Sequence, residues 1–387
     1  MESERSPFSP GAGTPPPLLV GRGAALETGR ALLERAQAGA SGGGMVLTGL
    51  AGTGKTVLLT LLAREAAGRG GTVLRLDASC QRPFLLRLAI GLKQVIIESG
   101  DCLEQVPYRG VCLGILKGFA ATHLADLDAA LGIDREAERG LADSGELERD
   151  LAQLLAWVGR LCGDTGSWLA LVIDGIQGLS REEFSALVRA MAGPRDQPPR
   201  AVLLGAGMPG PYGGHAGGAM EGKTGPVVVR VGPLSREEAA LALRAPFERA
   251  GRAITDNALV AVHDCSRGLP YFLQEWGCQL WKTAADHPVT LSDVGAARPR
   301  VEARLGEHFF RARLDRLAPR ENAYLYAMAG VGPLPCRASA VAARLGRSGS
   351  SCAPVRDKLI RKGMLYSPSY GMLDFAVPML GDFIGRA

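Results

Sequence analysis

The segment GLAGTGKT, residues 49–56, matches the phosphate-binding pattern G-x-x-x-x-G-K-[ST]. It lies between a predicted strand, Met45–Thr48, and a helix predicted to begin near Lys55, and a strand before and a helix after are the context in which this pattern binds phosphate. Small residues let backbone N–H groups converge on phosphate oxygens, and a helix N-terminus favours negative charge. Lys55 is expected to reach the β and γ phosphates, and Thr56 to hold Mg²⁺. The alternative is a chance Gly-rich turn, which the flanking strand and helix disfavour. The candidate nucleotide-binding residues here are Gly49, Ala51, Gly52, Thr53, Gly54, Lys55 and Thr56.

A second candidate lies in LVIDGIQGLS, residues 171–180, where an apolar run ends on Asp174. An acid at the end of a neighbouring strand is the usual partner of a P-loop, holding Mg²⁺ through water. The alternative is a turn-initiating Asp, which is common after any strand. Together with the P-loop, Asp174 predicts a site for Mg²⁺ and ATP or ADP.

The residue after Asp174 is Gly175, whereas ATP-hydrolysing P-loop proteins usually carry a second carboxylate beside this acid. Ser180 and Glu183 have the S-x-x-E spacing of a capping box, so Glu183 is expected to bond the backbone rather than water. Gln177 is the remaining candidate, because a Gln can orient an attacking water without deprotonating it. We therefore expect tight Mg-ATP binding with very slow hydrolysis.

Composition limits the other classes of function. The 387 residues carry a formal net charge of +5, too mild to indicate a nucleic-acid partner by itself. The eight Cys form no C-x-x-C pair and the five His are dispersed, so no structural metal site is expected. Residues 1–16 are polar and Pro-rich and predict a disordered tail. No stretch approaches the roughly 20 apolar residues of a membrane span, and we expect a cytoplasmic protein without membrane contact.

Strand and helix patterns alternate before residue 233, which predicts an α/β domain with a parallel sheet. The pattern from Ser235 to about Pro319 is helical, and residues 320–387 predict three short helices and a hairpin. The expected division is a tail (1–16), a P-loop nucleotide-binding domain (17–233), a helical lid (234–316) and a winged-helix domain (317–387).

Several segments together resemble AAA+ ATPases of the origin-recognition-complex-like type, which overlap with the STAND regulatory ATPases, and more closely a group of bacterial AAA-family ATP-binding proteins. These segments are LLVGRG, GLAGTGKT, LVIDGIQGLS, LLGAGMPG, VGPLSREEA, GLPYFLQEWG and LIRKGMLYSP. The resemblance implies a P-loop NTPase fold with an AAA+-type parallel sheet, a helical lid and a C-terminal winged helix. It implies that Val20, Gly21 and Arg22 lie against the adenine, and that Gly268 and Pro270 bring the lid to the phosphates. The alternative for Gly268 and Pro270 is a plain helix start with Pro in its first turn.

The chain departs from the pattern of these relatives in three places. Gly175 replaces their usual Glu, the strand at 201–207 ends without a polar sensor, and the Gly-rich segment 207–225 offers only Lys223 as a cation. Arg230 lies inside a predicted strand, so the direction of its side chain stays open. In the AAA+ strand order that the resemblance implies, Asp77 lies on an edge strand too far from the γ phosphate to replace the missing Glu.

Residues 317–387 predict helix, turn, helix and hairpin, the arrangement of a winged helix. In a DNA-binding interpretation the third helix enters the major groove of double-stranded DNA. The residues expected to contact DNA are Arg347, Arg356, Lys358, Arg361 and Lys362. The alternative is a module that packs on the nucleotide domain or binds a protein, because cations at a helix end also suit its dipole.

The sequence favours a regulatory switch in which bound ATP biases how the lid and the winged helix dock. The competing hypothesis is an active ATPase motor or remodeller that works as an oligomer, with an arginine supplied by a neighbour. A small-molecule kinase ranks last because no acceptor site can be identified. The sequence leaves the oligomeric state and the partner open.

Overall fold

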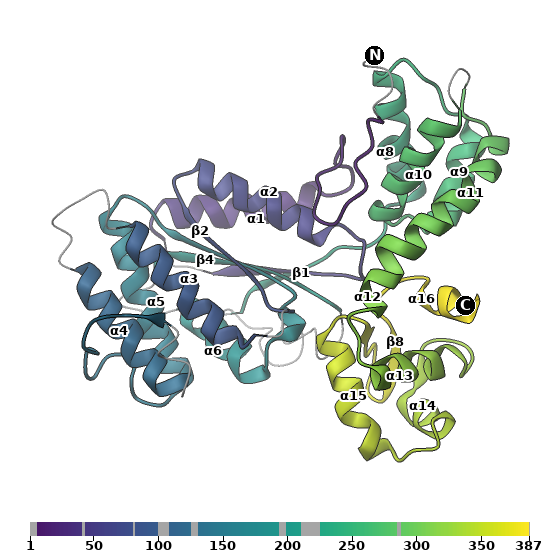
Figure 1. Ribbon diagram of the computed structural model, residues 1–387. Helices are drawn as coiled ribbons and strands as arrows, with labels where there is room; N and C mark the ends of the chain where they lie inside the picture. Colours follow the sequence, from purple (N-terminus) through teal and green to yellow (C-terminus); the bar gives the residue numbers. More distant parts are fainter. Residues whose placement is uncertain are drawn as a thin grey trace.

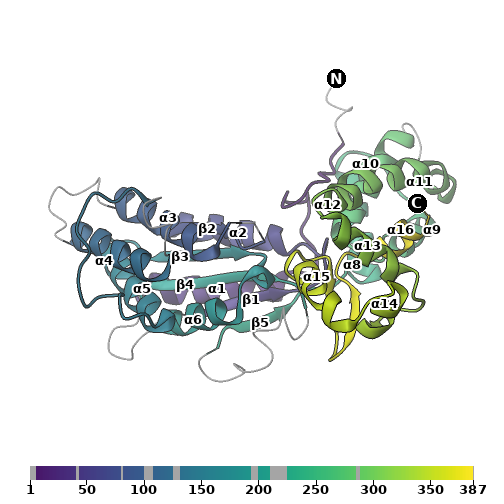
Figure 2. The same ribbon diagram turned by 60° about the horizontal axis from the view of Figure 1, so that its bottom comes forward.

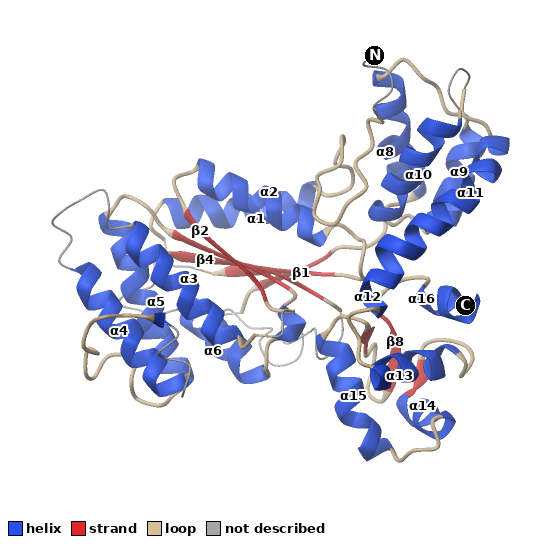
Figure 3. Cartoon of the chain, viewed as in Figure 1, coloured by secondary structure: helices blue, strands red, loops and turns tan. Residues whose placement is uncertain are grey.

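The computed structural model describes residues 6–40, 43–79, 82–99, 108–124, 131–192, 199–209, 225–284 and 288–386. Its centre is a parallel sheet with the strand order β2-β3-β4-β1-β5 (Figures 1 and 3). The strands are β1 Gly44–Thr48, β2 Thr72–Asp77, β3 Leu169–Asp174, β4 Ala201–Gly207 and β5 Val227–Arg230. The P-loop NTPase fold with an AAA+-type sheet, predicted from the sequence, is confirmed.

Helices cover both faces of this sheet (Figure 1). On one face lie α1 (Gly23–Gln37) and α2 (Lys55–Gly68), and on the other α3 (Phe84–Glu98), α5 (Leu147–Asp164) and α6 (Arg181–Ala192), with α4 (Tyr108–His123) packed against α3 and α5. Side chains of a strand alternate between faces, so Val172 joins the core under α1 and α2, while Leu171 and Ile173 join the opposite core. Packing against both cores fixes the register of the strands. At their carboxyl ends Asp174 lies opposite Asp77 of β2 and Ala206 of β4.

The lid consists of α8 (Arg236–Arg249), α9 (Asp256–Ser266), α10 (Pro270–Thr283) and α11 (Leu291–Leu305). A capping box lies at its start: Ser235 Oγ accepts from the Glu238 N–H and the Glu238 carboxylate accepts from the Ser235 N–H. A π-helix, η4 (Gly306–Arg311), and the short α12 (Ala312–Leu314) continue α11. Phe309 and Phe310 of η4 pack edge-on against Phe272 of α10, which fixes this junction.

The C-terminal part contains α13 (Pro319–Ala329), β6 (Cys336–Arg337), α14 (Ala338–Arg344), α15 (Gly349–Arg361), β7 (Leu365–Tyr366), β8 (Met372–Phe375) and α16 (Leu380–Arg386). Its small antiparallel sheet has the order β6-β8-β7. The sequence missed β6, which is two residues long, and α16, which is held by tertiary packing: Phe383 stacks on Phe310 with ring centroids 4.8 Å apart. Figure 2 shows this part beside the lid, at one end of the large sheet.

The prediction of a disordered tail is wrong for residues 6–16. These residues follow a defined path between the sheet domain and the lid, and Phe8 is only 4 % exposed (Figure 1). A single aromatic side chain that finds an apolar slot on the lid outweighs the local Pro, Gly and Ser content. Within the described residues, none of the helices is both long enough and apolar enough to span a bilayer.

Candidate nucleotide-binding site

The P-loop runs from the end of β1 into the N-terminus of α2, as predicted. Gly52 and Gly54 adopt φ of 83° and 96°, which side chains rarely allow. The ammonium of Lys55 donates to the carbonyls of Gly49 (2.6 Å) and Leu50 (2.8 Å). Burial lowers the pKa of Lys55 to about 8; nearby Asp174 opposes this shift and Arg313 adds to it. Lys55 is thus a buried cation held beside the loop, and no carboxylate of the described residues is hydrogen-bonded to it.

Thr56 and Asp174 face one another across the site. The Thr56 hydroxyl donates to Asp174 Oδ2 at 2.6 Å, and Asp174 Oδ1 accepts from the Gly175 N–H at 2.9 Å. A hydroxyl and a carboxylate oxygen at the mouth of a P-loop are the donors that Mg²⁺ prefers, so these two residues fit that ion.

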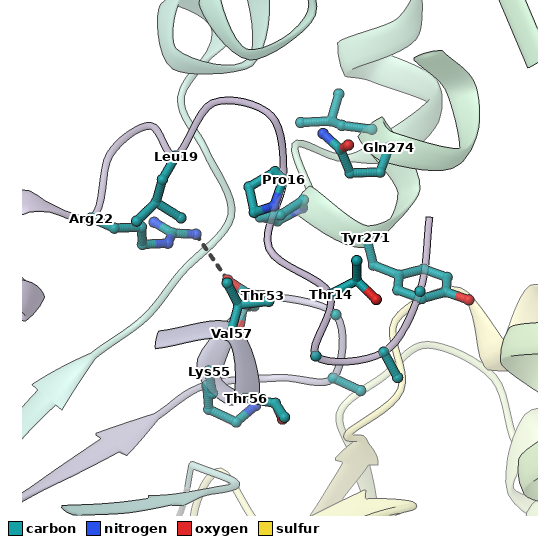
Figure 4. Close-up of a pocket in the computed structure, with 18 of the residues that line it drawn as sticks. Thr14, Pro16, Leu19, Arg22, Thr53, Lys55, Thr56, Val57, Tyr271 and Gln274 are labelled. Carbon is teal, nitrogen blue, oxygen red and sulfur yellow. Dashed lines mark hydrogen bonds between the residues drawn. The ribbon is translucent and has the colours of Figure 1, made fainter. Parts of the chain in front are cut away.

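Arg22 clamps the P-loop from the opposite side. Its Nη2 donates to the carbonyls of Thr53 (3.0 Å) and Gly232 (2.7 Å), which joins the loop to the segment entering the lid (Figure 4). Burial lowers the pKa of this guanidinium, and the charge of Glu238 partly offsets that effect. Val20 and Arg22 both line the pocket.

Three predicted glycines support the site without lining it. A Cβ on Gly49 would lie 2.1 Å from the Val231 carbonyl oxygen, and one on Gly268 would lie 2.3 Å from that of Leu234. At Gly21 a Cβ would lie 2.4 Å from the Glu238 carboxylate. These residues therefore permit the close backbone contacts that bring P-loop, β5 and lid together.

The other residues predicted for the nucleotide site line a cavity of about 220 Å³. Its wall comes from the N-terminal segment, the P-loop, the ends of β3 and β4, and the lid (Figure 4). Pro270 begins α10 at this wall, and the N–H of Tyr271 donates to the Gly52 carbonyl at 3.2 Å. The lid thus contacts the loop itself.

Gly175 and Gln177 occupy the loop after β3. Gly175 has φ of 73°, and a Cβ there would lie 3.1 Å from the Ser79 backbone nitrogen. Gln177, in the short 3₁₀ helix η3 (Ile176–Gly178), is buried, and its Oε1 accepts from the Met208 N–H at 3.3 Å. Gln177 lines the cavity, but part of its amide is already committed to the end of β4. Ser180 and Glu183 form the predicted capping box.

Because of this backbone geometry, Gly175→Glu is not expected to restore hydrolysis. A side chain at positive φ costs roughly 1–3 kcal/mol, and the new Cβ is directed at Ser79. We expect a lower melting temperature and no rise in phosphate release, measured with Gly175→Ala as the control for strain alone. A several-fold rise in turnover would contradict this account.

Arg313 is a pocket residue that sequence reasoning missed. It lines the cavity from α12, its guanidinium lies 4.0 Å from the Phe309 ring centroid, and it donates to the Phe309 carbonyl. Burial lowers its pKa, and its charge in turn lowers that of Lys55. In the sequence Arg313 lies among Arg311 and Arg316, and no spacing distinguishes it from these two exposed arginines.

Comparison with known proteins bears on the part of the chain that holds the loop and most of the sheet. Residues 18–204 match a family model described as an AAA ATPase domain. This part of the chain is similar to an AAA ATPase domain. Residues 307–384 match a second family model, described as a domain of unknown function. No curated protein matches the chain.

One solved structure supports the fold of the whole chain, and two others match it less closely. The Walker-type ATPase PABY2304 of Pyrococcus abyssi is similar at 16% identity and a TM-score of 0.55, over 95% of this chain and 96% of that one. The Aeropyrum pernix Orc1 protein in complex with DNA matches at 15% identity and 0.49, over 96% and 94%. The Thermotoga maritima RuvB Holliday junction branch migration motor matches at 16% and 0.42, over 92% of both chains. At such identities the likeness concerns the fold alone, and the last two scores are too low to carry an argument.

The residues predicted to contact DNA lie outside the matched residues 18–204 and outside the pocket. Arg347, Lys358 and Arg361 are exposed. Lys362 donates to the Glu321 carboxylate at 2.7 Å, and Arg356 to that of Asp357 at 3.0 Å, so two of the five cations have partners within the C-terminal part. Lys223 lies outside the described residues, and Arg230 is exposed on the edge strand β5.

Proposed function

We propose that this protein is an Mg-ATP-dependent regulatory switch that hydrolyses ATP slowly and whose nucleotide state controls the docking of its C-terminal part. Lys55 and the P-loop amides hold the phosphates, Thr56 and Asp174 hold Mg²⁺ with Asp174 acting through water, and Arg313 supplies a cation from the lid side. The bound Mg²⁺ neutralises charge on the β and γ phosphates.

One observation carries this proposal: the P-loop main chain is hydrogen-bonded to both other parts of the protein. The Gly52 carbonyl accepts from Tyr271 of the lid, and the Ala51 N–H donates to the Ala376 carbonyl at 2.9 Å, just after β8. Phosphate binding rearranges or locks this loop, because its N–H groups are the phosphate ligands. A nucleotide therefore interacts differently with docked and undocked arrangements, which a population shift requires.

Slow hydrolysis follows from what surrounds the expected water. Gly175 offers no carboxylate. The Asp77 carboxylate would lie 3.4 Å from a Cβ on Gly175, but it accepts hydrogen bonds from Ser79 and does not line the cavity. Gln177 does line the cavity, and we therefore assign it the role of orienting a water there. Missing general-base help costs roughly 10²–10⁴-fold in rate. The remaining turnover relies on positioning by the P-loop and on charge stabilisation by Lys55 and Arg313.

We propose further that the C-terminal part is a winged helix. The order α13, β6, α14, α15, β7, β8 supports this assignment. Gly363, just after α15, lies against the AAA ATPase domain: a Cβ there would be 3.1 Å from Gln177 Nε2 and 3.1 Å from Met208 Cε. Docking therefore covers one end of the helix that would read DNA. Undocking would present it to DNA or to a protein partner.

The experiment measures nucleotide binding and phosphate release on the full chain, in wild type, Gly363→Ala and Gly346→Ala. We expect wild type to bind Mg-ATP and turn over below about one per second, the lower end of the kinase range. Gly363→Ala separates the C-terminal part from Gln177 and is expected to change ATP affinity about 5-fold or more, the lower end of typical coupling.

Gly346→Ala is the matched control, because Gly346 has a similar φ of 63° but nothing lies within 4 Å of its Cβ position. Equal ATP affinities in the two variants would show that docking of the C-terminal part is not coupled to ATP binding. Turnover well above one per second, together with ATP-dependent assembly, would instead favour the alternative, a motor that works as an oligomer.

A further inference from the structure

Residues 6–16, here called the N-terminal strap, cross from the lid to the phosphate end of the cavity. Figure 4 shows Thr14 and Pro16 of the strap between Thr53 of the P-loop and the lid residues Tyr271 and Gln274. The strap is separate in sequence from the P-loop and is not part of the motifs that define the nucleotide site. Its two ends make different contacts.

One end is anchored on the lid by Phe8. The Phe8 ring lies 5.1 Å from that of Phe247, and it fills the space above Gly277, whose Cβ would lie 2.5 Å from Phe8 Cδ1. The N–H of Ser9 donates to Gln274 Oε1 at 3.2 Å. This anchor is one aromatic side chain and one hydrogen bond, so it is specific but can be released.

The other end lies on the residue expected to hold Mg²⁺. Gly13 has φ of 75°, and a Cβ there would lie 3.1 Å from Thr56 Cγ2. The turn is closed by the Thr14 N–H, which donates to the Gly11 carbonyl at 3.4 Å. Residues Gly11, Ala12, Gly13 and Thr14 all line the cavity. The strap backbone therefore lies where the phosphate end of a nucleotide would meet Thr56.

With the strap in place the cavity is small for a nucleoside triphosphate. Its volume of about 220 Å³ is below the roughly 300–1,000 Å³ of typical small-molecule pockets. We propose that the N-terminal strap is an intramolecular plug: it competes with the phosphates for the site at Thr56, and must leave before Mg-ATP binds. The plug sets the effective affinity and entry rate, since apparent affinity falls with the fraction of molecules whose site is open.

The test compares wild type with Phe8→Ala and Gly277→Ala in the full chain. The first removes the anchor, and the second fills its slot from within α10, where Ala suits the helix better than Gly. Gly295→Ala in α11 is the matched control, because nothing lies within 4 Å of its Cβ position. Stopped-flow fluorescence with a methylanthraniloyl-ATP probe and Mg²⁺ gives association rate and affinity. With the site open in about 1–10% of wild-type molecules, both anchor variants bind about 10- to 100-fold faster and tighter.

A second measurement follows the strap itself by hydrogen exchange. The amides of Phe8, Ser9 and Thr14 are hydrogen-bonded in the structure and are protected in unliganded wild type. They exchange faster in both anchor variants and in wild type saturated with a non-hydrolysable Mg-ATP analogue. The plug is refuted if the analogue leaves them protected, or if the anchor variants bind with wild-type rates or more weakly.

This inference rests on the proposed function, and the two fail differently. If no variant binds the ATP probe, the proposed function is wrong. If all bind it alike, the site stands and the plug does not.

Discussion

Lys55→Met is expected to reduce ATP affinity at least about 10- to 100-fold, because charge-assisted hydrogen bonds contribute roughly 1.5–3 kcal/mol each. The same substitution is expected to leave the unliganded protein at least as stable as wild type. Met is close to Lys in shape and lacks only the terminal ammonium, which keeps the core packing of α2.

The stability expectation follows from the buried ammonium. A Lys whose pKa falls from 10.5 to about 8 on folding costs about 3 kcal/mol of stability at pH 7. Loss of the bonds to the Gly49 and Leu50 carbonyls offsets part of this gain. Lys55 itself lines the cavity, so water can take the place of its ammonium.

The pH dependence gives the sign of the effect. The folded pKa is depressed, so the unfolded chain binds more protons and wild-type stability rises with pH between about 8 and 10.5. Below pH 8 the cost is complete, and above 10.5 it is gone. Thermal melts of both proteins at pH 7, 8 and 9.5 check this: the advantage of Lys55→Met should shrink as pH rises. A constant gap would contradict the assignment of the cost to the charge.

Gly268→Ala is expected to destabilise the protein by roughly 2–5 kcal/mol, combining strain at positive φ with a steric clash. Gly268 has φ of 67°, and its Cβ would lie 2.3 Å from the Leu234 carbonyl oxygen. Its own carbonyl accepts from the Leu234 N–H at 2.8 Å, which ties α9 and α10 to the segment leaving β5. Since Leu234 and Pro270 line the cavity, nucleotide affinity should fall as well.

Gly251→Ala measures the cost of a side chain at positive φ without a steric clash. Gly251, after α8, has a similar φ of 74° with nothing within 4 Å of its Cβ position, and should lose only about 1–2 kcal/mol and no nucleotide affinity. Urea unfolding and ATP binding on both variants separate the two contributions. Similar losses in the pair would show that contact with Leu234 is unimportant.

The parts of the site that the sequence predicted are those with local rules. The P-loop, the apolar strand before Asp174, and the cap at Ser180 each depend on residues within a few positions of one another. The strap, Arg313 and the docking of Gly363 do not. Phe8 is a lone aromatic in a Pro- and Gly-rich segment, and its slot is formed by residues about 240–270 positions away.

Gly175 is a different case: the sequence identified the position as important but could not show its backbone conformation. The sequence shows that the usual carboxylate is missing. Only the φ of 73° and the contact with Ser79 show that this loop has been built around a glycine. We therefore do not expect the addition of one side chain to raise ATP hydrolysis.

The π-helix η4 has a consequence for how this chain can vary. Each residue turns an α-helix by about 100°, and a π-turn adds one residue to the usual count. Arg313 follows η4 by two positions. The direction of its guanidinium therefore depends on the number of residues between the end of α11 and Arg313. Deleting one residue there would rotate Arg313 away from Lys55 even if every side chain were preserved. The constraint on this segment is one of length and helical phase, which substitution scans do not detect.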